Sequence, residues 1–266
     1  MILLLLLMGI ILVIKILTGW GNVGGSTTAH INLVNAFNEY GLEAKLYSPH
    51  EYHQDKCSSG KLSEFSCDEF DTIIAHFLTL PKLPCKKMIY SSHESDLDPL
   101  WKKDLSNYSK IHYVSRWQQQ FHNIKKSYTI IPNVLEDFKM NDKPSGKIGG
   151  VVGSVDRNKQ THKSILQALE DGCSKVYLFG NVTDQQYYET YVKGLISENV
   201  ILYGFCDNKQ LMYDMVTDVY QNSIRETWGY VSGECEMTGT KYHSSGMCNF
   251  EFMKKEDIIN AWRKIV

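Results

Sequence analysis

Residues 12–41, LVIKILTGWGNVGGSTTAHINLVNAFNEYG, decide the fold class of this chain. The run Leu12–Leu17, apolar except for Lys15, is typical of a parallel-sheet strand, which is buried on both faces. The glycine-rich loop after it leads into a helical pattern over Thr27–Tyr40, with apolar residues spaced along one face. Gly41 follows, where a glycine commonly ends a helix. The stretch predicts a strand, a loop and a helix, the first half of a βαβ unit.

The same alternation continues along the chain. Further strands are expected at Ala44–Ser48, Thr72–His76, Lys87–Ser92, Ile111–Ser115 and Tyr128–Ile131. The pattern then restarts, with strands expected at Ile148–Gly153, Lys175–Gly180, Val200–Tyr203 and Asp218–Gln221. Helices are expected between and after them, at Thr161–Leu169, Asp184–Leu195, Gln210–Met215, Gly229–Met237 and Lys255–Val266. Strands that alternate with helices predict parallel sheets covered by helices.

A polar, turn-forming segment, Glu136–Lys147, separates the two runs and is a candidate linker. We therefore predict an α/β protein with two Rossmann-like parallel-sheet domains facing a cleft, at residues 15–140 and 147–266. Ligands of such folds bind at the carboxyl ends of the strands. Residues 1–14 form an apolar N-terminal segment whose last part belongs to the first strand.

Composition narrows the function classes. Lys and Arg total 28 against 30 Asp and Glu, so the charge balance argues against a dedicated nucleic-acid binder. Seven cysteines without a C-x-x-C motif fit free thiols in a reducing compartment, and we expect a cytoplasmic protein. The segment 1–14 is shorter than the roughly 20 apolar residues of a membrane span. A peripheral membrane contact and a start-site artefact, with Met8 available as a start, stay open for it.

The first loop contains a literal G-x-G-x-x-G at Gly19, Gly21 and Gly24. Such a loop lets the backbone approach an anion at the start of a helix. A dinucleotide site also needs an acidic residue at the end of the second strand, and residues 47–50 provide none. We therefore favour a loop that faces a phosphate or a sugar. A tight structural turn and a NAD or FAD oxidoreductase remain the alternatives.

A second motif lies at an expected strand-to-helix junction, where residues 223–234 have the sequence SIRETWGYVSGE. Glu226 precedes the helix and Glu234 lies within it, eight residues later. The backbone N–H groups of residues 227–230 would point toward a diphosphate or a sugar. A carboxylate such as Glu234 suits a ribose diol, because two hydroxyl donors meet two acceptor oxygens. The alternative is two solvated glutamates at a helix end.

This stretch resembles the E-x(7)-E signature of the group 1 (family 4) glycosyltransferases, which have the two-domain GT-B fold. Other segments resemble family landmarks in the same order: Gly24-Gly25, Tyr90–His93, Tyr113–Ser115, Ile130–Val134 and Asn199–Phe205. The resemblance covers about residues 15–242. It implies sugar transfer from a nucleotide-sugar, with retention at the anomeric carbon, to an acceptor that is a glycan, a lipid, a protein or a modified nucleobase.

The resemblance also implies roles for individual residues. Glu226 would contact the donor sugar, Glu234 would hold the ribose, and His93 would bind the sugar or the diphosphate from the opposite domain. Lys159 stands where the family has a lysine that neutralises the diphosphate, so Glu226, His93 and Lys159 are the catalytic candidates. The expected donor-binding residues are Gly24, Gly25, Ser154, Arg157, Lys159, Thr227, Trp228, Gly229, Tyr230 and Glu234.

One departure from the family pattern bears on the site. Ser154 stands where the family usually has an arginine, and Arg157 is the expected substitute. We expect no metal and no other cofactor, because the helix dipole and Lys159 can stabilise the leaving diphosphate. The D-x-D at Asp96 and Asp98 lies on a poorly matched loop. A non-catalytic sugar-nucleotide or glycan-binding module is the main alternative to a transferase.

Overall fold

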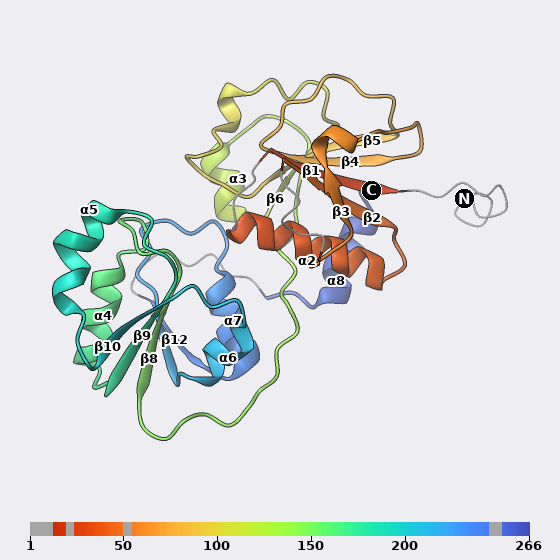
Figure 1. The fold of residues 1–266 in the computed structure, drawn as a ribbon. Helices are drawn as coiled ribbons and strands as arrows, with labels where there is room; N and C mark the ends of the chain where they lie inside the picture. Colours follow the sequence, from red (N-terminus) through yellow and green to blue (C-terminus); the bar gives the residue numbers. More distant parts are fainter. Residues whose placement is uncertain (1–12, 20–23, 50–54, 245–251) are drawn as a thin grey trace. The chain divides into compact units, whose positions relative to one another are not determined.

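The computed structural model describes residues 13–19, 24–49, 55–244 and 252–266 (Figure 1). The chain divides into two compact units. Unit 1 is formed by Met1–Leu135 and Glu251–Val266, and unit 2 by Glu136–Phe250. The predicted fold class is confirmed, because each unit contains a parallel sheet with helices. The apolar segment 1–12 and the central glycine of the first loop lie outside the described residues.

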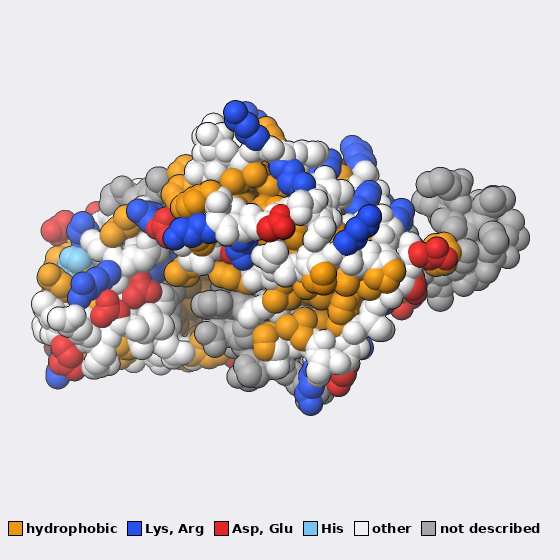
Figure 2. Space-filling view, turned by 90° about the horizontal axis from the view of Figure 1, so that it is seen from above, with side chains coloured by type: hydrophobic (Ala, Val, Ile, Leu, Met, Phe, Trp, Pro, Cys, Tyr) orange, Lys and Arg blue, Asp and Glu red, His pale blue; other side chains and the backbone are white. Residues whose placement is uncertain are grey.

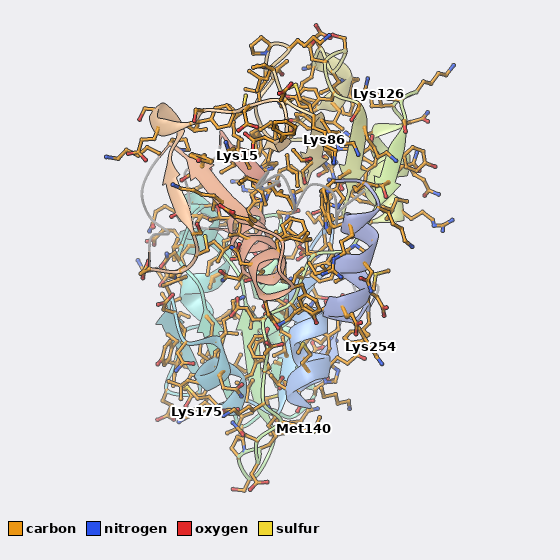
Figure 3. All side chains as sticks on the ribbon, turned by 90° about the vertical axis from the view of Figure 1, so that its right-hand side faces the viewer. Lys15, Lys86, Lys126, Met140, Lys175 and Lys254 are labelled. Atoms are coloured by element: carbon orange, nitrogen blue, oxygen red, sulfur yellow. The ribbon has the colours of Figure 1, made fainter. Side chains whose placement is uncertain are left out.

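Unit 1 contains a seven-stranded sheet with the order β3-β2-β1-β4-β5-β6-β7, and its paired strands are parallel. The strands are β1 (Ile14–Thr18), β2 (Ala44–Ser48), β3 (Ser59–Lys61), β4 (Thr72–His76), β5 (Lys87–Ser92), β6 (Lys110–Tyr113) and β7 (Tyr128–Ile130). The central strands β1, β4 and β5 are buried along almost their whole length, as is typical of strands inside a parallel sheet. Lys15 on β1, labelled in Figure 3, is kept at the sheet by an ion pair of 2.6 Å with Asp71.

The helices of unit 1 are α2 (Gly25–Glu39), α3 (Arg116–His122) and α8 (Lys255–Arg263), with 3-10 turns η1 (Leu62–Glu64) and η2 (Leu100–Lys102). We predicted that residues 147–266 form one domain. The helix α8, within these residues, belongs instead to unit 1. Its apolar stripe is buried in the same core cluster as α2. The rings of Trp262 and Phe37 meet edge to face, with centroids 5.8 Å apart. An amphipathic pattern predicts a buried face but not which sheet covers it.

Unit 2 contains a five-stranded parallel sheet with the order β10-β9-β8-β11-β12. Its strands are β8 (Ile148–Val152), β9 (Lys175–Phe179), β10 (Val200–Gly204), β11 (Asp218–Tyr220) and β12 (Lys241–His243). Its helices are α4 (Thr161–Glu170), α5 (Gln185–Tyr187), α6 (Lys209–Asp214) and α7 (Tyr230–Thr238). The predicted helix Asp184–Leu195 is divided into α5, the π-helical turn η3 (Tyr188–Val192) and the 3-10 turn η4 (Lys193–Leu195).

The surface of unit 1 carries several exposed aromatic and aliphatic side chains. In Figure 2 hydrophobic side chains lie among Lys and Arg side chains on the face seen from above. Leu97, Trp101 and Tyr128 are the exposed large apolar residues of the segment from residue 97 to residue 128. Trp101 contacts the ring of Phe121 on α3, with centroids 5.9 Å apart. Within the described part of the chain, no helix has the combination of length and apolar character that crossing a membrane requires.

Candidate functional site

The loop that follows β8 begins at a close contact between two backbones. Gly153 has φ +126° and Gly180, after β9, has φ +151°. A Cβ atom on Gly180 would lie 1.9 Å from the carbonyl oxygen of Gly153. Any side chain at this position would collide with a backbone atom, so only glycine allows the two loops to meet. This contact fixes the start of the loop that carries Ser154 and Lys159.

Lys159 and Glu226 form an ion pair at the carboxyl edge of the sheet of unit 2. The Nζ of Lys159 donates to Oε2 of Glu226 at 2.7 Å, and both side chains are half-buried. Gln221 Nε2 also lies 3.3 Å from that oxygen. Lys159 follows β8 and Glu226 follows β11, and these two strands are neighbours in the sheet. The fold therefore brings together two predicted site residues that are 67 positions apart.

Backbone hydrogen bonds hold these two loops against each other. The N–H of Ile224 donates to the carbonyl oxygen of Asn158 at 2.8 Å. The side chain of Asn158 donates to the Arg225 carbonyl and accepts from the Arg225 N–H, each at 3.2 Å. Asp156 accepts from the backbone N–H of Lys159 at 2.8 Å. These bonds order the backbone on both sides of the ion pair before any ligand arrives. Sequence reasoning did not assign Asp156 or Asn158 to the site, because neither belongs to a recognised motif.

Glu234 lies in the second turn of α7, and its burial excludes the alternative of a solvated glutamate at a helix end. The residue is 3% exposed. Its carboxylate accepts from Nζ of Lys209 at 2.8 Å and from the hydroxyl of Tyr213 at 2.5 Å. Both partners come from α6, which packs against α7. The resemblance implied that Glu234 holds a ribose, but in this structure α6 covers the carboxylate and satisfies its oxygens.

Glu234 shares its cationic partner with a second carboxylate. Lys209 also pairs with Glu136 at 2.8 Å. Burial lowers the pKa of Lys209, but the carboxylates of Glu234 and Glu136 outweigh burial and raise the pKa above its ordinary value. Burial and the neighbouring Glu234 raise the pKa of Tyr213 well above its ordinary value, so its hydroxyl stays a donor. Sequence reasoning missed Lys209, Tyr213 and Glu136, since no spacing relates α6 or the linker to the E-x(7)-E motif.

The residues at the start of α7 pack in part against each other. Trp228 is buried, and its ring meets that of Tyr230 with centroids 4.8 Å apart. The N–H of Tyr230 donates to the Trp228 carbonyl at 3.1 Å, so this group is used within the turn and does not point outward as expected. Gly229 caps α7 without a side-chain hydrogen bond. Thr227 lies half-buried just after Glu226.

Two further candidates after β8 have partners of their own. Arg157 pairs with Asp184 at 3.1 Å and donates to Gln186 at 3.1 Å, at the start of α5. Ser154 donates to Oδ2 of Asp156 at 2.5 Å. We expected Arg157 to take the role of the family's arginine. For that, the guanidinium of Arg157 would have to leave Asp184.

In unit 1 the candidates lie after β1 and β5. Gly24 caps α2 and Gly25 begins it, and a Cβ built on either residue meets no described atom within 4 Å beyond the adjoining chain and the helix's own backbone. His93 follows β5 and is buried. Its ring packs against those of His30 and His76, with centroids 4.6 and 5.2 Å away. Burial and the neighbouring histidines lower the pKa of His93 well below its ordinary value, so its imidazole is neutral.

The D-x-D motif has a structural partner in the same unit. Asp98 is buried, pairs with Lys103 at 2.7 Å and accepts from the hydroxyl of Tyr90 at 2.7 Å. Asp96 is exposed. Among the described residues no group of three or more His, Cys, Asp or Glu side chains is arranged to hold a metal ion.

Comparisons with known proteins identify the fold. No family model and no curated protein matches the sequence. The chain is similar to the crystal structure of HepE from Anabaena in complex with UDP and glucose, with 15% identity, a TM-score of 0.63, and 87% of this chain and 80% of that chain covered. It is also similar to WaaG, a glycosyltransferase involved in lipopolysaccharide biosynthesis. The identity is 12%, the TM-score is 0.62, and 95% of this chain and 90% of that chain are covered.

An α-glucosyltransferase in complex with UDP and a mismatched 13-mer DNA is similar as well, with 12% identity, a TM-score of 0.66, and 96% and 89% of the two chains covered. The structural neighbours are GT-B glycosyltransferases. Two parallel-sheet α/β units in one chain match that architecture. The protein therefore has the GT-B glycosyltransferase fold, as the resemblance implied.

Proposed function

We propose that this protein is a glycosyltransferase that moves a sugar from a nucleotide-sugar to an acceptor. The observation that carries the proposal is the Lys159–Glu226 pair, held at the carboxyl edge of β8 and β11 next to the start of α7. Edges of this kind are where ligands of doubly wound sheets bind. The neighbours with bound UDP support a uridine nucleotide as the first donor to test.

The chemistry follows from the charges of these groups. Breaking the bond between a sugar and a diphosphate leaves negative charge on the diphosphate and positive charge on the sugar ring. Lys159 and the N–H groups at the start of α7 would stabilise the diphosphate. The carboxylate of Glu226 would stabilise the sugar, and Glu234 would hold the ribose after a rearrangement of its contacts with α6. We propose retention at the anomeric carbon on the resemblance alone.

Substitution of Lys159 tests the leaving-group role. In Lys159→Gln we expect UDP release from UDP-glucose, with water as the acceptor, to fall by about 100-fold to 1000-fold, because a preorganised positive charge on the leaving group is lost. Lys163→Gln is the matched control, since Lys163 is an exposed lysine on α4 of the same unit. Equal rates in both variants would refute the role. Binding of UDP-glucose without UDP release in the unsubstituted protein would favour the non-catalytic binding module.

Chelation tests whether transfer proceeds without a metal. We propose that Lys159 and the helix start replace a divalent cation, so EDTA should change the rate of UDP release by less than about twofold. Loss of release in EDTA, with recovery on adding manganese or magnesium, would contradict this proposal. Asp96→Asn should then abolish the recovery if the D-x-D loop holds the metal.

A further inference from the structure

Asn158 bonds to both backbone groups of one residue in the neighbouring loop. Its Nδ2–H donates to the carbonyl oxygen of Arg225 at 3.2 Å, and its Oδ1 accepts from the backbone N–H of Arg225 at 3.2 Å. The backbone carbonyl oxygen of Asn158 also accepts from the N–H of Ile224 at 2.8 Å. These three bonds, which we call the Asn158 clamp, join the loop after β8 to the loop after β11.

The chemistry of the clamp requires an amide side chain. An amide offers a donor and an acceptor side by side, and the N–H and C=O of Arg225 offer the complementary acceptor and donor. Two residues exchange hydrogen bonds in the same way across an antiparallel pair of strands. An ionised aspartate in place of Asn158 has no donor, and a leucine of similar size has neither group. The two side-chain bonds therefore depend on the residue type at position 158.

The clamp lies one residue before each member of the ion pair between the loops. Lys159 follows Asn158, and Glu226 follows Arg225. In the proposed reaction a diphosphate would draw Lys159 and the donor sugar would face Glu226. A bound donor would therefore weaken the 2.7 Å contact between the two side chains while both have to stay in place. The clamp bonds to the backbone of the second loop, so it can keep the two loops together without the ion pair.

Other contacts restrict each loop separately. Asp156 accepts from the backbone N–H of Lys159 at 2.8 Å and from the hydroxyl of Ser154 at 2.5 Å, within the first loop. Just after β11, Asn222 donates to Oε1 of Gln167 on α4 at 3.0 Å. The clamp adds what these contacts lack, because it fixes one loop against the other. A displacement of a reacting group by about 1 Å costs on the order of 100-fold in rate, so such a link affects the chemistry directly.

We propose that Asn158 is a positioning residue that keeps Lys159 and Glu226 at their working separation when a donor is bound. Asn158 acts through the backbone of the two loops and not by contact with the donor. The catalytic half of this inference rests on the proposed function, whereas the clamp itself is a property of unit 2 alone. The two halves have separate experiments.

Solvent-exchange NMR of the full-length protein tests the clamp without any ligand. In Asn158→Ala the backbone amide hydrogen of Arg225 should exchange about fivefold to tenfold faster, which is the effect of one neutral hydrogen bond. Amides of β11 should exchange at unchanged rates. Asn141→Ala is the matched control, because Asn141 is an exposed asparagine of the same unit whose amide donates to Asp214 at 2.9 Å. Unchanged exchange of Arg225 in Asn158→Ala would overturn the clamp and with it the positioning role.

Kinetics of UDP release from UDP-glucose test the catalytic half. Asn158→Ala should lower kcat about 10-fold and change KM by less than about twofold, because placement of charge counts most in the transition state. Combined with Glu226→Gln, the total loss should be smaller than the product of the two single losses, since Asn158 acts partly through Glu226.

A total loss equal to that product, or an unchanged kcat in Asn158→Ala, would overturn the catalytic half even if the clamp is confirmed. Asn141→Ala should keep the kcat and KM of the unsubstituted protein. If the unsubstituted protein releases no UDP, the proposed function and the catalytic half both fail. The exchange rate of the Arg225 amide would then still decide whether Asn158 holds the two loops together.

Discussion

Replacing Lys209 with methionine should lower the free energy of unfolding by about 3–5 kcal/mol, because the carboxylate of Glu234 would stay buried without its cation. Lys209 lies 2.8 Å from both Glu234 and Glu136. Methionine has a similar length and can fill the space of the lysine stem, so the change removes the charge more than the packing. Urea unfolding at pH 7, followed by circular dichroism, measures the difference.

Two further variants show whether the loss comes from the buried charge. Lys193→Met removes an exposed pair with Glu189 at 2.7 Å, with the side chains 60% and 46% exposed, and should lower stability by less than about 0.5 kcal/mol. Adding Glu234→Gln to Lys209→Met should recover part of the lost stability, because an amide in the same place carries no charge. A small loss in Lys209→Met, equal to that of Lys193→Met, would mean that Glu234 does not need the cation.

Acid should destabilise this protein well above the pH at which its carboxylates titrate. Burial, followed by the neighbouring histidines, lowers the pKa of His76 and of His93 well below 6.5, and Lys103 adds to the effect on His76. Burial lowers the pKa of His112 to about 4. Between these folded values and the ordinary pKa of an unfolded histidine, the unfolded chain binds protons that the folded chain does not. Stability is therefore fully present above about pH 6.5 and is lost as the pH falls below it.

The size of this effect follows from the pKa difference. One pKa unit corresponds to about 1.4 kcal/mol, so His112 alone should withdraw about 2 kcal/mol of stability between pH 6.5 and pH 5. His76 and His93 add to this loss in the same direction. Urea midpoints at pH 7.5 and pH 5 give the difference. Equal midpoints would contradict the prediction, as would NMR titration of the three histidines near pH 6.5.

A matched variant separates this cluster from the other histidines. His162 lies half-buried on α4 of unit 2. Burial lowers its pKa only modestly, so His162→Gln should leave most of the pH dependence intact. His76→Gln removes one of the three imidazoles of His76, His93 and His112. It should reduce the loss of stability between pH 7.5 and pH 5. If the stability of the two variants depends equally on pH, the buried histidines of unit 1 are not the cause of the loss in acid.

The long strands and helices of both units could be predicted from local patterns. The predicted strands Ala44–Ser48, Thr72–His76 and Lys87–Ser92 are strands with those bounds. The strands β3 and β12 and the helix α3 were missed. The two strands have three residues each, too few to show a period, and the apolar residues of α3 are only Trp117 and Phe121. Such segments take their structure from the neighbour they pair with or pack against.

The sequence by itself determined the order of strands and helices, the division into two parallel-sheet runs and the residues at the loop ends, because periodicity and glycine placement are local properties. The family resemblance assigned Lys159 and Glu226 to one donor site, and the pairing of β8 with β11 brings the two side chains together. Only the tertiary structure decided that α8 completes unit 1, that α6 buries Glu234, and that Asn158 bonds to the backbone of Arg225. Those three outcomes depend on contacts between elements distant in sequence, where burial removes water and leaves each polar atom to the partner that the packing provides.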